Sequence, residues 1–242
     1  MTLEICCYNI ESALIAQNAG ANRIELCAGP TEGGTTPGPG TIHIARKIIS
    51  LPLFVMIRPR GGDFLYSENE VETMLQDIVF AKKAGADGVV FGMLKPDGTV
   101  DIERTAHLVE AAHPMEVTFH RAFDMTANPF RALEDIISTG ARRILTSGQK
   151  PTAIQGADLI SALVKRAGNR ISIMAGSGIN EVNVLDLITR TGVQEIHLSA
   201  KKYFPSKMLF QNPGLSMGKS NLDEYRTVLA DGEMIQRLLA NL

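Results

Sequence analysis

The chain has 242 residues, of which 45% are hydrophobic and 21% are charged, and its net charge is −2. This balance argues against nucleic acid as a partner, because such proteins usually rely on a basic surface. No apolar run approaches the roughly 18 residues of a membrane span, so we expect no membrane partner either.

The cysteines and the N-terminal stretch indicate the compartment. Cys6, Cys7 and Cys27 are too few for a disulfide scaffold in a chain of this length. The first residues, "MTLEICCYNIES", lack the basic region and long apolar run of a signal peptide. We therefore expect a cytoplasmic protein in a reducing environment.

In chain order, the sequence predicts eight strands, each followed by a helical pattern, the last of which covers about 222–239. The strands are expected at Leu3–Cys7, Arg23–Cys27, Leu53–Arg58, Gly88–Met93, Glu116–Arg121, Arg143–Thr146, Ile171–Ala175 and Glu195–Ser199. Near-continuous apolar strands that alternate with helices are typical of a parallel sheet covered by helices.

A repeat supports this reading. The segments "GANRIELCA", "GADGVVFGM", "GARRILTSG" and "GVQEIHLSA" begin at Gly20, Gly85, Gly140 and Gly192, and each glycine closes a helical stretch. Helices often end in a left-handed residue, usually glycine, so each copy predicts a helix, a tight loop and a buried strand.

Eight such units predict one (β/α)8 TIM barrel, which usually needs about 250 residues. We expect a single domain over residues 1–242, because no linker rich in proline, glycine or serine divides the chain. An open doubly wound sheet is the alternative, but it would usually carry a glycine-rich turn after the first strand, where "CCYNIES" stands.

Polar residues collect toward the carboxyl ends of the predicted strands, where barrel active sites lie. Alternation along each strand directs Glu25, Arg58, His120, His197 and Ser199 into the barrel. An interior this polar must be satisfied by pairing or by a ligand. The alternation leaves His197 open between a hydrogen bond in the core and a ligand contact.

Two residues near the strand starts have a simpler interpretation. Glu4 and Arg23 are expected to pair or cap at the bottom of the barrel.

The loop "RPRGGDF" places Arg58 and Arg60 at the barrel mouth. Arginine cannot shed its charge and suits bidentate binding of carboxylate or phosphate. We expect its partner to be Glu25, Asp124 or an anionic ligand.

The turn "MAGSGIN" after the seventh strand offers a second anion site. Gly176, Ser177 and Gly178 would let backbone N–H groups approach a phosphate, a helix is expected after Asn180, and Ser199 would add a hydroxyl. The alternative is that the turn simply needs its glycines.

The sequence resembles the CutC family of copper-homeostasis proteins along its whole length. The matching motifs are "LEICCYNIESA", "RIELCAGPTEGG", "RPRGGDF", "VTFHRAFDM", "ILTSGQK", "IMAGSGI" and "NPGLSMG". The resemblance implies a TIM barrel, a cytoplasmic location, a homo-oligomer and a role in copper handling.

Two functions follow for the site. In the first, Cys6 and Cys27, which share a face on adjacent strands, bind Cu(I), and Met56 adds a thioether. Cu(I) prefers such soft ligands, although free cysteines also pack simply as small apolar residues.

In the second, the barrel is an enzyme acting on a small anionic or phosphorylated metabolite. Glu25 and His120 would transfer protons, and Asp124 would orient His120 or an arginine. A third reading is a site that binds its ligand without turnover. No motif in the chain specifies a reaction.

Overall fold

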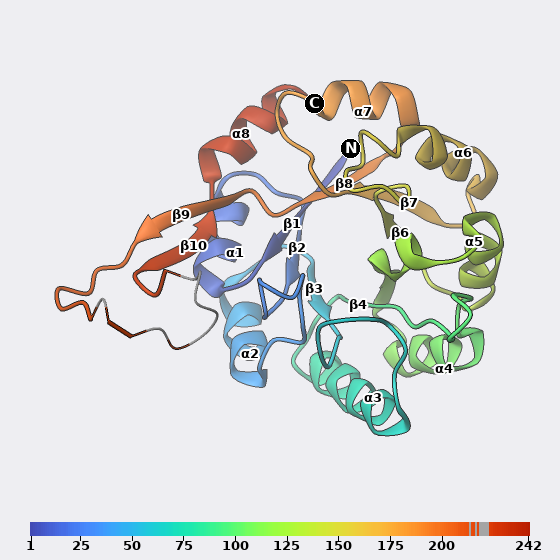
Figure 1. The fold of residues 1–242 in the computed structure, drawn as a ribbon, viewed down its shortest axis with the longest axis horizontal. Coiled ribbons are helices and arrows are strands. Elements are labelled where there is room, and N and C mark those ends of the chain that lie inside the picture. Colours follow the sequence, from blue (N-terminus) through green and yellow to red (C-terminus); the bar gives the residue numbers. More distant parts are fainter. Residues whose placement is uncertain (213, 216, 218–222) are drawn as a thin grey trace.

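The structure is a computed structural model that describes residues 1–212, 214–215, 217 and 223–242 (Figure 1). Eight parallel strands close into a barrel in sequence order, and helices surround it, which confirms the predicted TIM barrel. The strands are β1 Thr2–Cys7, β2 Arg23–Leu26, β3 Leu53–Met56, β4 Gly88–Phe91, β5 Glu116–Phe119, β6 Arg143–Thr146, β7 Ser172–Gly176 and β8 Glu195–Leu198.

A helix follows each barrel strand from β1 to β7, and the last helix follows a further hairpin. They are α1 Ile10–Asn18, α2 Pro39–Ile48, α3 Glu68–Lys83, α4 Ile102–Ala112, α5 Pro129–Ser138, α6 Ala157–Ala167, α7 Val184–Thr191 and α8 Gly232–Ala240. The repeat glycines Gly20, Gly85, Gly140 and Gly192 have φ values of 101°, 87°, 85° and 72°, so each lies in the left-handed region. The repeat therefore marks the helix ends, as the sequence predicts.

Strand alternation separates two cores. Leu3, Ile5 and Cys7 of β1 point outward into the large apolar core between the strands and the helices. Cys6 points inward and belongs to a small cluster with Cys27, Phe54, Met56 and Val90. Cys6 and Glu25 are register partners on β1 and β2, which brings the thiol and the carboxylate to the same height in the barrel.

The C-terminal region differs from its prediction. A helix was expected over about 222–239; Leu222 lies outside the described residues, and α8 begins only at Gly232. Residues Arg226–Ala230 form β10, which pairs antiparallel with β9, Lys201–Pro205. The stretch "RTVLA" is rich in β-formers, and Asp231 then caps α8 by accepting a hydrogen bond from Met234 N.

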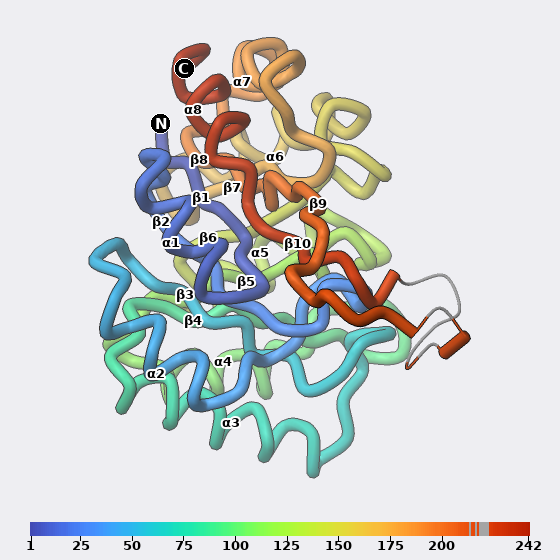
Figure 2. Tube along the Cα trace, turned by 90° about the vertical axis from the view of Figure 1, so that its left-hand side faces the viewer, coloured from blue at the N-terminus to red at the C-terminus, as the bar shows by residue number. Residues whose placement is uncertain are grey.

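The hairpin of β9 and β10 extends beyond the ring of helices (Figure 2). It follows β8 directly, so its first residue, Lys201, stands at the carboxyl end of the barrel. Among the described helices, none combines the length and apolarity that a membrane crossing requires.

Candidate functional site

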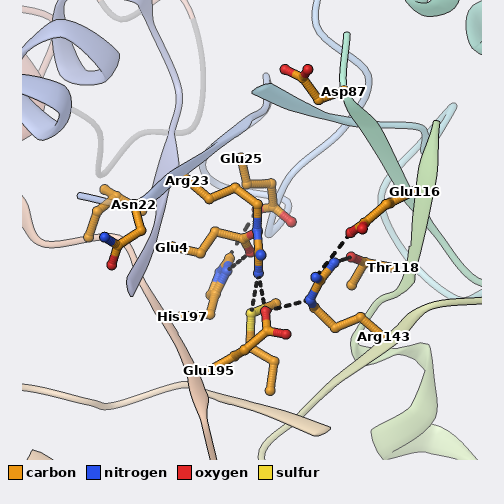
Figure 3. A network of polar contacts seen from close by, with 12 residues as sticks. Glu4, Asn22, Arg23, Glu25, Asp87, Glu116, Thr118, Arg143, Glu195 and His197 are labelled. Atoms are coloured by element: carbon orange, nitrogen blue, oxygen red, sulfur yellow. Dashed lines mark hydrogen bonds and ion pairs between the residues drawn. The ribbon is translucent and has the colours of Figure 1, made fainter. Parts of the chain in front are cut away.

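An ionic layer of Glu4, Arg23, Arg143 and Glu195 lies inside the barrel (Figure 3), one inward-facing level before Cys6 and Glu25 along β1 and β2. Arg23 donates to Glu4, as expected for this pair, and its Nη2 lies 2.5 Å from Glu195 Oε2. Arg143 Nε donates to the same Glu195 oxygen at 2.5 Å, and its Nη2 lies 3.2 Å from Glu116 Oε2. Each buried charge in this layer therefore has an opposite partner.

His197 connects this layer to the atoms above it. Its Nδ1 lies 2.7 Å from Glu4 Oε1, and its Nε2 lies 3.9 Å from Glu25 Oε2. Burial alone would lower the pKa of His197, but Glu25, Cys6 and Glu4 raise it well above its ordinary value. Burial would raise the pKa of Glu4, but His197 and Arg23 lower it to about 2. The two side chains form an ion pair.

The sulfur atoms of Cys6 and Cys27 lie 3.7 Å apart, and Cys27 Sγ lies 3.3 Å from Glu25 Oε2. Both cysteines are buried and free. One ligand atom each from Cys6, Cys27 and Glu25 falls within 4.8 Å of the others, and so do atoms from Glu4, Glu25 and His197. Glu25 Oε1 is buried with no hydrogen-bond partner among the described residues.

Protonation distinguishes these groups. The hydrogen bond from Cys27, together with His197, holds the pKa of Cys6 well below its usual value despite burial. Burial raises the pKa of Cys27 and of Glu25 well above their usual values, and the neighbouring Cys6 adds to both shifts. The two pKa shifts have opposite directions, so Cys6 loses its proton more readily than Cys27 does.

The sulfur spacing suits one metal ion. Metal–thiolate bonds are about 2.3 Å long, so two sulfurs at a tetrahedral angle on one ion would stand roughly 3.8 Å apart, close to the observed 3.7 Å. Met56 belongs to the same buried cluster. Cys7 points into the apolar outer core, and burial raises its pKa well above the usual value, so it is not a ligand.

A cavity of about 500 Å³ opens above the sulfur pair at the carboxyl ends of the strands. Of the residues predicted for the site, it is lined by Cys6, Glu25, Arg58, His120, Ser177, Gly178 and Ser199. Cys27, Arg60, Asp124 and Gly176 do not line it. Cys27 contacts Cys6 through its sulfur atom. A Cβ on Gly176 would lie 2.6 Å from Leu145 Cδ1, so this glycine permits close packing in the barrel.

Arg58 has carbonyl partners and does not pair with Glu25 or Asp124, two of the three partners that the sequence left open beside an anionic ligand. Its Nη atoms donate to the carbonyl oxygens of Glu32, Gly34 and Gly62 at 2.7, 2.9 and 2.8 Å. These bonds join the loop after β2 to the loop after β3. Within the described part of the chain, no carboxylate lies within 4 Å of Arg58, and its buried Nε has no partner.

Arg60 and Asp124 serve the loops around the mouth. Arg60 binds Glu70 at 2.6 Å and Asp63 at 3.1 Å, outside the cavity. Asp124 accepts from Thr146 Oγ1 at 2.5 Å and from Arg121 Nε at 2.8 Å. Asp124 thereby orders the loop after β6 and fixes Arg121, which lines the cavity.

His120 follows β5 and caps the short 3-10 helix η1, Arg121–Met125. Its Nδ1 accepts from Ala122 N at 3.2 Å, which assigns the proton of the neutral ring to Nε2. Burial and the nearby charge of Arg58 lower the pKa of His120 to about 3. Nε2 is buried without a partner, so the geometry favours a hydrogen-bond donor, while an acid–base role for His120 and Glu25 stays a prediction.

The loops after β7 and β8 carry backbone strain. Ser177 and Ala200 have φ values of 84° and 41°, a region that non-glycine residues enter at a cost and mostly at functional sites. The N–H groups of Ser177, Gly178, Ser199 and Ala200 donate to no other described residue. α7 begins at Val184, because Asn180 and Asn183 first form a turn of their own.

Sequence reasoning missed two charged residues of the interior, Arg143 and Glu195. Glu195 has the same strand alternation as the predicted His197, so the signal was present. Their pairing across β6, β7 and β8 is not visible in a linear sequence. Lys201, which also lines the cavity, enters it through the unexpected hairpin.

Comparison with known proteins places this geometry in a family. The sequence model of the CutC family matches residues 1–202. The chain is 47% identical to a family protein CutC from Mesorhizobium japonicum, over 98% of this chain and 93% of the relative, and 47% identical to one from Porphyromonas gingivalis, over 98% and 96%. The crystal structure of CutC from Streptococcus agalactiae, whose name refers to copper homeostasis, superposes with a TM-score of 0.78 at 33% identity, covering 81% of this chain and 97% of that one.

Proposed function

Because the chain belongs to the CutC family, we propose that it binds Cu(I) as its cargo between the thiolates of Cys6 and Cys27, in the reducing cytoplasm. The observation that carries this proposal is the buried sulfur pair, 3.7 Å apart, with the unpartnered Glu25 Oε1 beside it. Cu(I) selects soft thiolate ligands, and two sulfurs on one face of the barrel supply them.

The surroundings support a thiolate site. The thiolate is the metal ligand, and a low cysteine pKa is typical of a sulfur beside a cation. Cys27 and His197 lower the pKa of Cys6, while burial raises the pKa of Cys27, which must lose its proton when the ion binds. Metal binding therefore releases a proton, and affinity should rise with pH.

An anaerobic titration tests the proposal. The protein competes for Cu(I) with a chromogenic chelator, as wild type and as Cys6→Ser, Cys27→Ser and Cys7→Ser. Cys7 is the matched control, because it is a neighbouring buried thiol that faces the opposite core. We expect wild type and Cys7→Ser to take the ion from the chelator, and the other two variants to fail.

Two results would overturn the proposal. One is that all four proteins compete equally, or that none does. The other is displacement of Cu(I) by an equal concentration of Zn(II), since the cysteine, histidine and carboxylate donors present also suit zinc.

A further inference from the structure

We propose that the cavity above the sulfur pair binds a second ligand, a small organic molecule whose oxyanionic group accepts hydrogen bonds from Arg58 Nε and His120 Nε2. This inference goes beyond copper binding and does not depend on it. It names a ligand class, small metabolites that carry a phosphate monoester or a free carboxylate, for donors that the protein itself leaves unused.

The first argument is the two unused donors. Arg58 and His120 are only 6% and 4% exposed, and Arg58 Nε and His120 Nε2 have no hydrogen-bond partner among the described residues. A buried donor without a partner costs about 1–3 kcal/mol, so such groups are rare and need a reason. Both residues line one cavity, where a ligand would supply an acceptor, and Arg58 also interacts with the buried hydroxyl of Tyr66.

Both donors belong to one wall of the cavity. The Phe64 ring lies 4.9 Å from the His120 ring and 5.0 Å from the Arg58 guanidinium carbon, measured to the ring centroid. Arg58 is fixed by three carbonyl oxygens and His120 by Ala122 N, so both donors are held in position before any ligand binds. A Cβ on Gly92 would lie 2.8 Å from His120 Nδ1, so the backbone of β4's end also leaves space for this ring.

The charge of the lining favours an anion. Arg58 has no carboxylate within 4 Å, and Lys201 contacts the Tyr8 ring at 4.5 Å without an ion pair to a described residue. A cavity with uncompensated cations and low-dielectric walls attracts anions.

The opposite wall sets the ligand's size. Ser177, Gly178 and Ser199 line the cavity from the loops after β7 and β8, and their N–H groups donate to no described residue. A molecule that reaches from Arg58 to these loops must be larger than a bare ion. The volume of about 500 Å³ lies within the 300–1,000 Å³ typical of small-molecule sites.

Isothermal titration calorimetry on the full chain tests the proposal with three probes: glycerol 3-phosphate, malonate and uncharged glycerol. We expect heat from at least one anion and none from glycerol. Binding of the phosphate alone or of the carboxylate alone then identifies which oxyanion the donors select.

Two substitutions isolate His120. In His120→Asn, Oδ1 can still accept from Ala122 N while the donor at Nε2 is lost; in His120→Gln, a donor remains near the Nε2 position. We expect His120→Asn to weaken anion binding about tenfold, as for one hydrogen bond to a charged group, and His120→Gln to lose less. Arg170→Gln removes an exposed arginine that pairs with Glu134 and should change nothing.

A measurement on wild type guards against misfolded variants: the nitrogen resonance of His120 Nε2 should shift when the anion is added. The proposal is overturned if neither anion gives heat, or if binding leaves this resonance unmoved. It is also overturned if His120→Asn binds as wild type does. The single variant Cys27→Ser, whose side chain does not line the cavity, should lose copper binding and keep anion binding, which separates this result from that of the copper titration.

Discussion

The interior of the barrel has two polar levels that differ in how completely they are paired. In the ionic layer, Arg23 and Arg143 share the carboxylate of Glu195, and every buried polar side-chain atom described there has a partner. In the level above, buried atoms of Glu25, Arg58 and His120 have none. Both levels contain charged residue types, so polarity alone does not mark a functional site.

The difference follows from what each level must do. Buried charges stabilise a fold only when opposite partners compensate their desolvation, and the ionic layer meets that condition. In the upper level, unpaired donors and acceptors destabilise the fold, and a bound ion or anion would offset this free energy by pairing with them. Within the barrel interior, unmet hydrogen bonding thus distinguishes the upper level from the ionic layer, although Tyr66 and Thr105 also have unpartnered buried hydroxyls outside the cavity lining.

Breaking the ionic layer should have the largest effect. Arg23→Met removes the cation between Glu4 and Glu195 and leaves two buried carboxylates short of a partner. We expect the free energy of unfolding to fall by about 3–5 kcal/mol, the usual cost of breaking a buried ion pair from one side. Urea unfolding at pH 7 measures it.

Arg170→Gln is the surface control for this experiment, and its urea midpoint should not move measurably. A loss of stability in Arg23→Met no larger than in the control would show that the ionic layer is not structural.

Two glutamates within one contact network sharpen the comparison. Glu4 has its pKa lowered from 4.5 to about 2, so it stabilises the fold above pH 4.5 and loses that contribution as the pH falls toward 2. Glu4→Gln should therefore lower the stability of the metal-free protein by about 3 kcal/mol at pH 7. Urea midpoints at pH 7 and pH 4 measure the difference.

The pKa shift of Glu25 has the opposite direction to that of Glu4. Its raised pKa keeps a proton in the folded state that the unfolded chain loses above pH 4.5, so this group destabilises the fold as the pH rises. Glu25→Gln should make the metal-free protein more stable at pH 7 and leave it unchanged at pH 4. Equal losses in the two variants would contradict the assignment of Glu4 to the structural layer and Glu25 to the site.

The smallest expected effect belongs to His120. Its pKa is lowered from 6.5 to about 3, so the unfolded state binds a proton in this window that the folded state does not, and stability falls as the pH drops below 6.5. Between pH 6.5 and pH 5 the loss from this group is about 2 kcal/mol. His120→Asn should lack that part of the pH dependence; parallel curves for wild type and variant would show that His120 is charged in the fold.

The fold and the membership of the inner level could be read from sequence because both depend on periodicity. Alternation along β1, β2 and β8 placed Cys6, Glu25 and His197 inside, and the repeat glycines fixed the helix ends. The partners of Arg58 could not be read, since they are backbone carbonyls in two loops that meet only in the folded barrel.

The tautomer of His120 could not be predicted either, because it depends on the hydrogen bond by which His120 caps η1. The sequence predicted a strand that continued to Arg121 at this place. The strand β10 was read as helix, because only its pairing with β9 distinguishes the two for a short apolar run.

The ionic layer also determines the route of exchange. Because paired arginine and glutamate side chains fill the barrel below Cys6 and Cys27, an ion could pass toward the amino ends of the strands only by breaking them. The ion would therefore enter and leave through the same mouth, at the carboxyl ends of the strands. A molecule in the mouth would lie in the path of the ion, so loading would be ordered, metal first and anion second, and the anion would have to leave before the metal is handed on.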